Sequence, residues 1–337
     1  MAWPGENLVI KLWETIADKG IGSLLKPWQM RREGRATVDI RRAELLALAQ
    51  AEIDAATIRS GEKILLPDGT LSNVSTSMQE FLPAPSSQPL LLPHIEKIAE
   101  DNFRVEAIRR EISIAKAVIH AEEELAQDPQ KPSAAQVSED WLLRWRDCAA
   151  SVSSDELHSL WGKVLAGEVK TPGNFSLRTL EFLRNLSQDE ARGIEKLSQL
   201  VVSNIIFRGD QAILHSEGVT FSLLLMMQEL GIVSGVESIG MEMTWSSSSQ
   251  DKFEHPLLSY GRVLMVRHAD AKHQLKLQIY QITTLGRQIL KLGTFQANDN
   301  YLRVLGAAIK SQGFDVEIGS YIPISGDQIN LINMTPL

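Results

Sequence analysis

The hydrophobic period of this chain changes near residue 203, and this change restricts the fold more than any single motif. From 94 to 202, apolar residues recur at the three- and four-residue spacing of amphipathic helices. After 203, stretches such as GMEMTW, GRVLMVRH and LKLQIYQIT read as strands, with helical stretches before and after them. The order predicts an α+β protein, with mainly helical N-terminal and central regions followed by a winged-helix-like C-terminal α+β unit.

Turn-forming residues divide the chain into four parts. Its length of 337 residues exceeds one ordinary hydrophobic core, so two or more domains are expected. Residues 60–93 are rich in Pro and Ser and contain a Pro-Asp-Gly turn signal, which predicts a linker. The expected parts are N-terminal amphipathic and basic helices over 1–59, this linker, a helical central domain over 94–203, and an α+β domain over 204–337.

Polar residues in capping positions mark the starts of the central helices. Ser154 is followed by two acidic residues, and Ser187 has Glu190 three residues later, as helix N-termini and capping boxes do. The tryptophans at core spacing in this region are Trp141, Trp145 and Trp161, and helical periodicity places Leu157 on the same apolar face as Trp161. Farther on, residues 204–215, NIIFRGDQAILH, predict a β-hairpin that turns at the Gly-Asp pair.

The stretch KGIGSLLKPWQMRREGRA, residues 19–36, combines a short apolar patch with clustered cations. Between Lys19 and Arg42 there are seven Lys/Arg and two Asp/Glu, in a protein whose net charge is −8. An apolar face with tryptophan beside cations is typical of an interfacial helix. Three interpretations stay open: packing on the protein or another subunit, a membrane surface, and nucleic acid. The residues expected to make the membrane or partner contact are Leu24, Leu25, Lys26, Trp28, Arg31, Arg32 and Arg35.

The residue types do not assemble into a recognisable catalytic or metal site. The seven histidines are scattered, without a cysteine or HExxH partner, and the single cysteine, Cys148, has no identifiable base. No glycine pattern fits a phosphate-binding loop. We therefore expect no catalytic residue, no metal, no cofactor and a non-enzymatic role. The acidic balance argues against nucleic-acid binding by the protein as a whole.

The sequence also lacks the pattern of a targeting segment. No run reaches the roughly 18–20 apolar residues of a membrane span, and charged residues interrupt the first twenty positions. One cysteine fits a reducing compartment. These features predict a cytoplasmic location, and the basic segment leaves the periphery of the inner membrane open.

Residues 140–191 contain a series of short motifs. They are SDEL at 154–157, LW at 160–161, LAGE at 165–168, PGNFS at 172–176 and RTL at 178–180. This segment resembles the centre of an uncharacterised bacterial family with an SDELxxLWxxLLAGE and PGxFSxRTL pattern, although position 164 is valine here. With the GIG and KPW stretches near the N-terminus, it is similar to abortive-infection alpha proteins of bacteria. The resemblance implies a bacterial, non-secreted, mainly helical protein with antiviral defence as a setting, and supplies no catalytic residues.

Two classes of function follow from these observations, and a third, an enzyme of unrecognised type, stays open without a residue to name as its catalyst. The first is a non-enzymatic protein that acts by self-association, or by contact with a protein partner or a membrane surface, with a homo-oligomer as the expected state. The alternative is a DNA-binding regulator that uses the C-terminal winged-helix-like unit. The acidic balance of the sequence counts against nucleic acid as a partner.

We predict that a broad-specificity protease first cuts the native protein within residues 67–89, because this Pro- and Ser-rich stretch offers little to pack. Mass spectrometry of the earliest fragments locates the cut. First cuts within 140–200 would contradict the predicted linker.

Overall fold

The computed structural model describes residues 4–18, 50–65, 71–73 and 92–337, with short gaps. The positions left out inside these ranges are 52, 55, 59, 61, 210, 238–240, 248, 326 and 327. Contacts divide the chain into two units, residues 1–180 and residues 181–337. The division falls within helix α8, whereas the sequence placed the boundary at 203.

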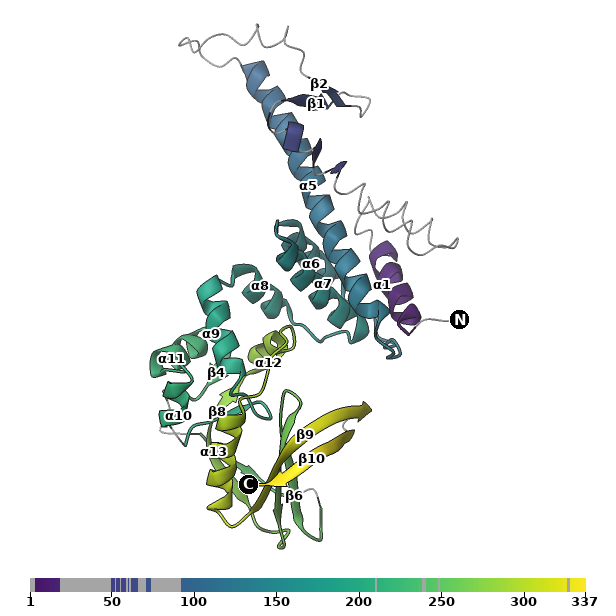
Figure 1. The fold of residues 1–337 in the computed structure, drawn as a ribbon. Coiled ribbons are helices and arrows are strands. Elements are labelled where there is room, and N and C mark those ends of the chain that lie inside the picture. Colours follow the sequence, from purple (N-terminus) through teal and green to yellow (C-terminus); the bar gives the residue numbers. More distant parts are fainter. Residues whose placement is uncertain are drawn as a thin grey trace. The chain divides into compact units, whose positions relative to one another are not determined.

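The first unit is built mainly from helices. Its elements are α1 (Glu6–Asp18), β1 (Lys63–Leu65), β2 (Leu71–Asn73), α5 (Leu92–Ala126), α6 (Glu139–Ala150), α7 (Asp155–Lys170) and the first residues of α8 (Leu177–Asn185). The two short strands pair antiparallel within the predicted linker. Figure 1 shows the C-terminal half of the long helix α5 lying among α1, α6 and α7.

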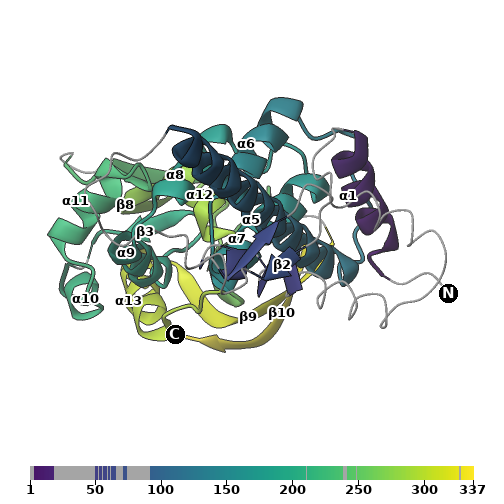
Figure 2. The ribbon, with the colours of Figure 1, turned by 90° about the horizontal axis from the view of Figure 1, so that it is seen from above.

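Two glycines allow the helices of this unit to approach closely. A Cβ at Gly162 on α7 would lie 2.5 Å from the Cβ of His120 on α5, so only glycine fits at this crossing. At Gly5, just before α1, a Cβ would lie 1.9 Å from the Leu125 carbonyl. The amide of Gly5 donates to the Ala126 carbonyl at 3.2 Å. These approaches hold α1 and α7 against the same end of α5 (Figure 2).

The second unit combines helices with antiparallel sheets. Its elements are α9 (Gln188–Ser198), β3 (Ile205–Phe207), α10 (Gln211–Ser216), α11 (Phe221–Glu229), β4 (Val233–Ser234), β5 (Met241–Trp245), β6 (Phe253–Ser259), β7 (Arg262–His268), β8 (Leu275–Ile282), α12 (Thr284–Leu290), α13 (Asp299–Lys310), β9 (Asp315–Ser325) and β10 (Gln328–Pro336).

The first part of this unit has the element order of a winged helix. α9 precedes β3, the helix pair α10 and α11 follows, and β4, β5 and β8 complete a small sheet. β8 is its central strand, because Ile279 pairs with Phe207 of β3 on one side and with Met241 of β5 on the other. Gly218, at φ 76°, makes the turn between α10 and α11, where a side chain would be strained.

A second antiparallel sheet has the strand order β10-β9-β7-β6. Its strands β6 and β7 lie between β5 and β8 in the chain, where a winged helix has its wing. α13 packs on β7 and β9 and buries Leu302, Leu305 and Ile309. One face of this sheet therefore shares a core with a helix (Figure 1).

The α+β prediction is confirmed, and so are two helix starts. The Ser154 hydroxyl accepts from the Leu157 amide, and Ser187 and Glu190 form a capping box at α9. The hairpin predicted over 204–215 is wrong. β3 pairs with β8, and residues 211–216 form helix α10.

We predict that Trp161→Ala lowers the free energy of unfolding of the first unit by about 3–5 kcal/mol, as large truncations in cores do. Trp161 is only 2% exposed. Leu157, expected on the same buried face, is 42% exposed, so Leu157→Ala is the matched control and should cost well under half as much. Urea unfolding followed by tryptophan fluorescence measures both. Equal, small losses would refute a core role for Trp161.

Candidate protein-contact surface

The tryptophans of the central motifs are structural. The indole of Trp145 donates to the Trp161 carbonyl at 2.9 Å, and the indole of Trp141 donates to the Phe175 carbonyl at 2.7 Å. All three tryptophans are buried. The indole N–H groups of Trp141 and Trp145 therefore fasten α6 to α7 and to the turn after it, rather than facing a ligand.

Glu168, in the LAGE motif, is also structural. Its carboxylate accepts from the Gly173 amide at 2.6 Å and from the Phe175 amide at 2.9 Å, and the residue is 3% exposed. Burial raises the pKa of Glu168, against the opposing effect of these backbone hydrogen bonds. The side chain thus closes the turn that contains the PGNFS motif and has no face open to a substrate.

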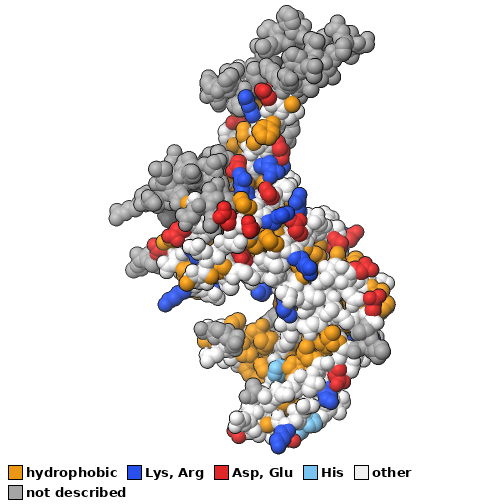
Figure 3. All heavy atoms as spheres, turned by 180° about the vertical axis from the view of Figure 1, so that it is seen from behind, with side chains coloured by type: hydrophobic (Ala, Val, Ile, Leu, Met, Phe, Trp, Pro, Cys, Tyr) orange, Lys and Arg blue, Asp and Glu red, His pale blue; other side chains and the backbone are white. Residues whose placement is uncertain are grey.

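A polar depression of about 530 Å³ on the first unit is lined by charged groups. It includes His120, Glu123 and Asp128 from the end of α5 and beyond, and Lys163 from α7. His120 lies 3.3 Å from Glu123 and 3.5 Å from Asp155. Charges of both signs also alternate along α5 (Figure 3). The lining lacks the apolar walls of a small-molecule site and fits a solvated face.

The predicted contact residues lie outside the described residues. These are Leu24, Leu25, Lys26, Trp28, Arg31, Arg32 and Arg35. Within the described part of the chain, no three His, Cys, Asp or Glu side chains converge as ligands of a metal ion would. In the same part, no helix has the length and apolar character needed to cross a membrane.

Helix α11 presents an apolar stripe on the second unit. Thr220 caps its start by accepting from the Leu223 amide. Its inner side packs on α9, where Leu223, Met226 and Met227 surround Gly193. The opposite stripe contains Phe221, Leu225 and Glu229, spaced four residues apart. The ring of Phe221 is 57% exposed.

Acidic side chains lie beside this stripe. Glu237 accepts from the Gln228 amide group on α11 at 2.9 Å, and Glu242 accepts from Gln278 at 3.1 Å. Gln278 in turn lines a shallow depression of about 600 Å³ next to Phe221. We use the name α11 surface for five residues together: Phe221, Leu225, Glu229, Glu237 and Glu242.

The sequence around the α11 surface contains no cation over a long stretch. Residues 209–251 include six Asp/Glu and not one Lys or Arg. Cations nevertheless border it: Arg208 lies 5.4 Å from the centre of the Tyr280 ring and lines the same depression, and Lys276 is exposed on β8, two positions before Gln278. α11 is the second helix of the pair α10–α11. In helix-turn-helix proteins the second helix enters the DNA major groove, and contacts between cations and phosphates supply much of the affinity.

The α11 surface therefore has the wrong charge for a nucleic acid and the right composition for a protein contact. An exposed aromatic ring beside half-buried aliphatic side chains can be buried by a partner, and the carboxylates around it favour a partner with Lys or Arg. No motif marks this surface in the sequence, because its signal is the absence of cations over 209–251.

Part of the chain matches a known protein family. Residues 99–211 match the family model described as a protein of unknown function, DUF2806. The matched range is about a third of the chain and runs from α5 to β3, so it contains the tryptophans and Glu168. No curated protein and no solved structure matches the chain.

We predict that the first unit loses stability as the pH falls below about 6.5. Burial, and secondarily Lys116, lower the pKa of His158, while Asp155 opposes the shift. The unfolded chain then takes up the proton before the folded one, so falling pH favours unfolding, by up to about 1.4 kcal/mol per pH unit. Urea unfolding from pH 7.5 to 5.5 measures the slope.

His158→Leu should flatten this slope. His255 on β6 also has a pKa lowered by burial, but it lies in the second unit. Tryptophan fluorescence reports mostly on the first unit, which contains six of the seven tryptophans. His255→Leu is therefore the control and should leave the slope unchanged. An unaltered slope in His158→Leu would contradict the assignment.

Proposed function

We propose that this chain is a non-enzymatic bacterial protein that acts by self-association in the cytoplasm. In the proposed contact, the basic segment around Trp28 of one copy binds the α11 surface of another. The observation that carries the proposal is the apolar, cation-free α11 surface, flanked by carboxylates, in a chain that also contains a strongly basic apolar segment. The similarity of its motifs to abortive-infection alpha proteins suggests antiviral defence as the setting.

The basic segment and the α11 surface have opposite charge, and both include apolar residues. Residues 19–42 have seven Lys/Arg and two Asp/Glu, whereas 209–251 have six Asp/Glu and no Lys or Arg. Contact between such surfaces would bury Trp28 with Phe221 and pair guanidinium groups with Glu229, Glu237 or Glu242. Copies joined head-to-tail through this contact would form a ring or an open chain, and two copies that exchange their basic segments would close a dimer.

The experiment that tests self-association also distinguishes two other partners, a membrane surface and DNA. The basic segment also has the composition of a membrane-surface helix, in which each cation near anionic lipid contributes about 1 kcal/mol. The winged-helix element order supports the second candidate, a DNA-binding regulator, while the charge of the α11 surface opposes it.

We predict that combined Arg31→Glu, Arg32→Glu and Arg35→Glu changes lower the oligomeric mass, measured by light scattering after gel filtration, because they reverse the charge of the basic segment. Phe221→Ser should have the same effect, because it removes the apolar centre of the α11 surface. The matched control is Arg192→Glu, Lys196→Glu and Arg303→Glu, three exposed cations of the second unit, with the same change in net charge. It should keep the wild-type mass.

The other outcomes identify the other partners. If the Arg31, Arg32 and Arg35 variant keeps its mass but no longer pellets with anionic liposomes, the segment binds membranes and the proposed contact fails. If the wild type binds a short DNA duplex with strong salt dependence, and Phe221→Ser abolishes that binding, the DNA-binding alternative replaces it.

A further inference from the structure

The four-stranded sheet of the second unit has two edges, formed by β6 and β10. A strand at a sheet edge leaves half of its backbone N–H and C=O groups without a ladder partner, and can template another strand. Natural proteins protect such edges with proline, charged side chains or bulges. The two edges of this sheet differ in this respect.

The β10 edge has no charged side chain. Residues 328–336 include none, and from 319 to 337 the chain has one charged residue, Asp327. The β9–β10 hairpin also exposes apolar groups: Ile322 is 55% exposed and Ile324 is 65% exposed. In the space-filling view, hydrophobic side chains gather on this hairpin (Figure 3).

Strand register places further apolar residues on the opposite face of the hairpin. Ile329 lies opposite Pro323, and Leu331 lies opposite Tyr321. Side chains directly opposite one another share a face of an antiparallel pair. The face with Ile329 and Leu331 is therefore apolar, and the other face, which has Asn330 beside Ile322, is uncharged.

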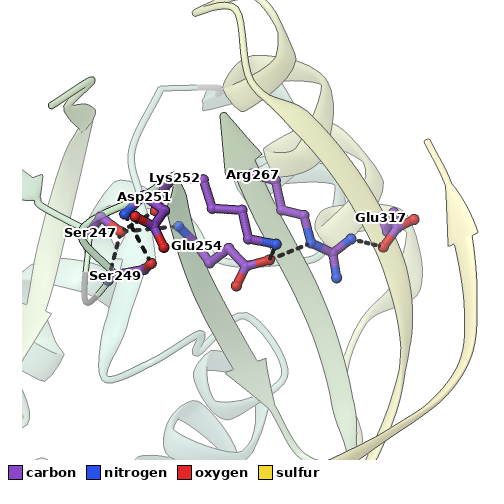
Figure 4. A network of polar contacts seen from close by, with 7 residues as sticks. All are labelled: Ser247, Ser249, Asp251, Lys252, Glu254, Arg267 and Glu317. Atoms are coloured by element: carbon purple, nitrogen blue, oxygen red, sulfur yellow. Dashed lines mark hydrogen bonds and ion pairs between the residues drawn. The ribbon is translucent and has the colours of Figure 1, made fainter. Parts of the chain in front are cut away.

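The β6 edge is protected. Pro256 stands in the middle of β6 and has no N–H to offer. Two charged residues lie at its start: the Lys252 amine is 2.8 Å from the Glu254 carboxylate. Figure 4 shows how Arg267 on β7 then joins Glu254 to Glu317 on β9. The β6 edge is thus guarded by proline and charge, whereas β10 has only uncharged side chains over 328–332 and has its bulge and Pro336 beyond that part.

We infer that β10 pairs antiparallel with β10 of a second copy of this chain, about a two-fold axis at Asn330. β10 itself has no inserted residue over 328–332. The register shift between Gln328 and Ile329 inserts Ile324 on β9, whereas the shift between Ile332 and Thr335 inserts a residue on β10, where Asn333 has φ 53°. Asn330 is the centre of this part and is exposed. Centring the axis there places each Ile329 opposite Leu331 of the second copy, on the apolar face.

Charge selects a second copy as the partner. Each chain has a net charge of −8, so two copies repel except where their facing surfaces carry no charge. The β10 edge is such a surface, and pairing with itself brings no charge against an apolar side chain. The guarded β6 edge disfavours head-to-tail addition of β10 to β6, so the pairing closes at a dimer.

This inference deepens the proposed function, since it rests on self-association, but it uses a different contact. The test introduces charge at the axis: Asn330→Lys and Asn330→Asp each place two like charges opposite one another. Each variant alone should have half the wild-type mass by light scattering, and an equimolar mixture should regain it. Ala307→Lys, an exposed position on α13, is the control and should keep the wild-type mass.

A cross-link provides a second measurement that does not depend on charge. Asn330→Cys should form a disulfide-linked dimer on mild oxidation, because residues opposite one another across an antiparallel pair are within disulfide range. Gln328→Cys should not, because its counterpart lies four positions away along the paired strands. The native Cys148 is buried and does not compete.

The outcomes separate this inference from the proposed function. Unchanged mass in both charged variants, or no covalent Asn330→Cys dimer, overturns the β10 pairing and leaves the head-to-tail contact standing. Halved masses that mixing does not restore overturn the axis at Asn330. If the Asn330 variants behave as expected and the changes at Arg31, Arg32, Arg35 and Phe221 alter nothing, the pairing stands and the proposed function fails.

Discussion

The first unit depends on the close contact between α5 and α7 at Gly162. Any side chain there would collide with His120, so the distance between the two helices is set by a residue without a Cβ. The same helix supplies the Trp161 carbonyl that receives the Trp145 indole, and the Glu168 carboxylate that receives two amides of the following turn. Burying that carboxylate is tolerable only because those donors are in place. One helix therefore fixes α5, α6 and the turn at 173–175 together.

The parts of the fold that the sequence predicted are those decided by neighbouring residues. Capping at Ser154 and Ser187 depends on positions within three residues, and both predictions are confirmed. The hairpin expected at 204–215 is wrong, because β3 finds its partner in β8, about 70 residues away, and no local pattern reports such a pairing. Leu157 was placed in the core by periodicity, but the helix turns that position outward. The α11 surface was missed because an absence of cations forms no motif, and the basic segment of 19–36 lies outside the described residues.

Charge in this chain is divided by region rather than spread evenly. Residues 19–42 have an excess of five cations, 209–251 have no cation, and 319–337 have a single charge. The acidic and the basic regions attract one another over distances of the order of a Debye length, about 8 Å at physiological salt. Residues 319–337 have almost no charge and exert no such long-range attraction. A contact made by this region would depend on backbone hydrogen bonds and apolar packing. Contacts built on these regions should differ in salt dependence, since only the first kind is screened.

β6 and β7 are inserted between β5 and β8, and this insertion affects the cooperativity of unfolding. Both strands enter from β5 and return to β8, so the chain passes from one sheet to the other and back. Backbone and hydroxyl bonds also join β6 to the segment just before β3: the Ser203 amide donates to the Leu258 carbonyl at 2.8 Å, and the Ser259 hydroxyl donates to the Val201 carbonyl at 2.8 Å. Fraying of β9 and β10 would remove the ladder partner of β7 and loosen the segment that holds β5 against β8. The winged helix and its added sheet should exchange their amide protons as a single foldon, and neither should persist when the other is deleted.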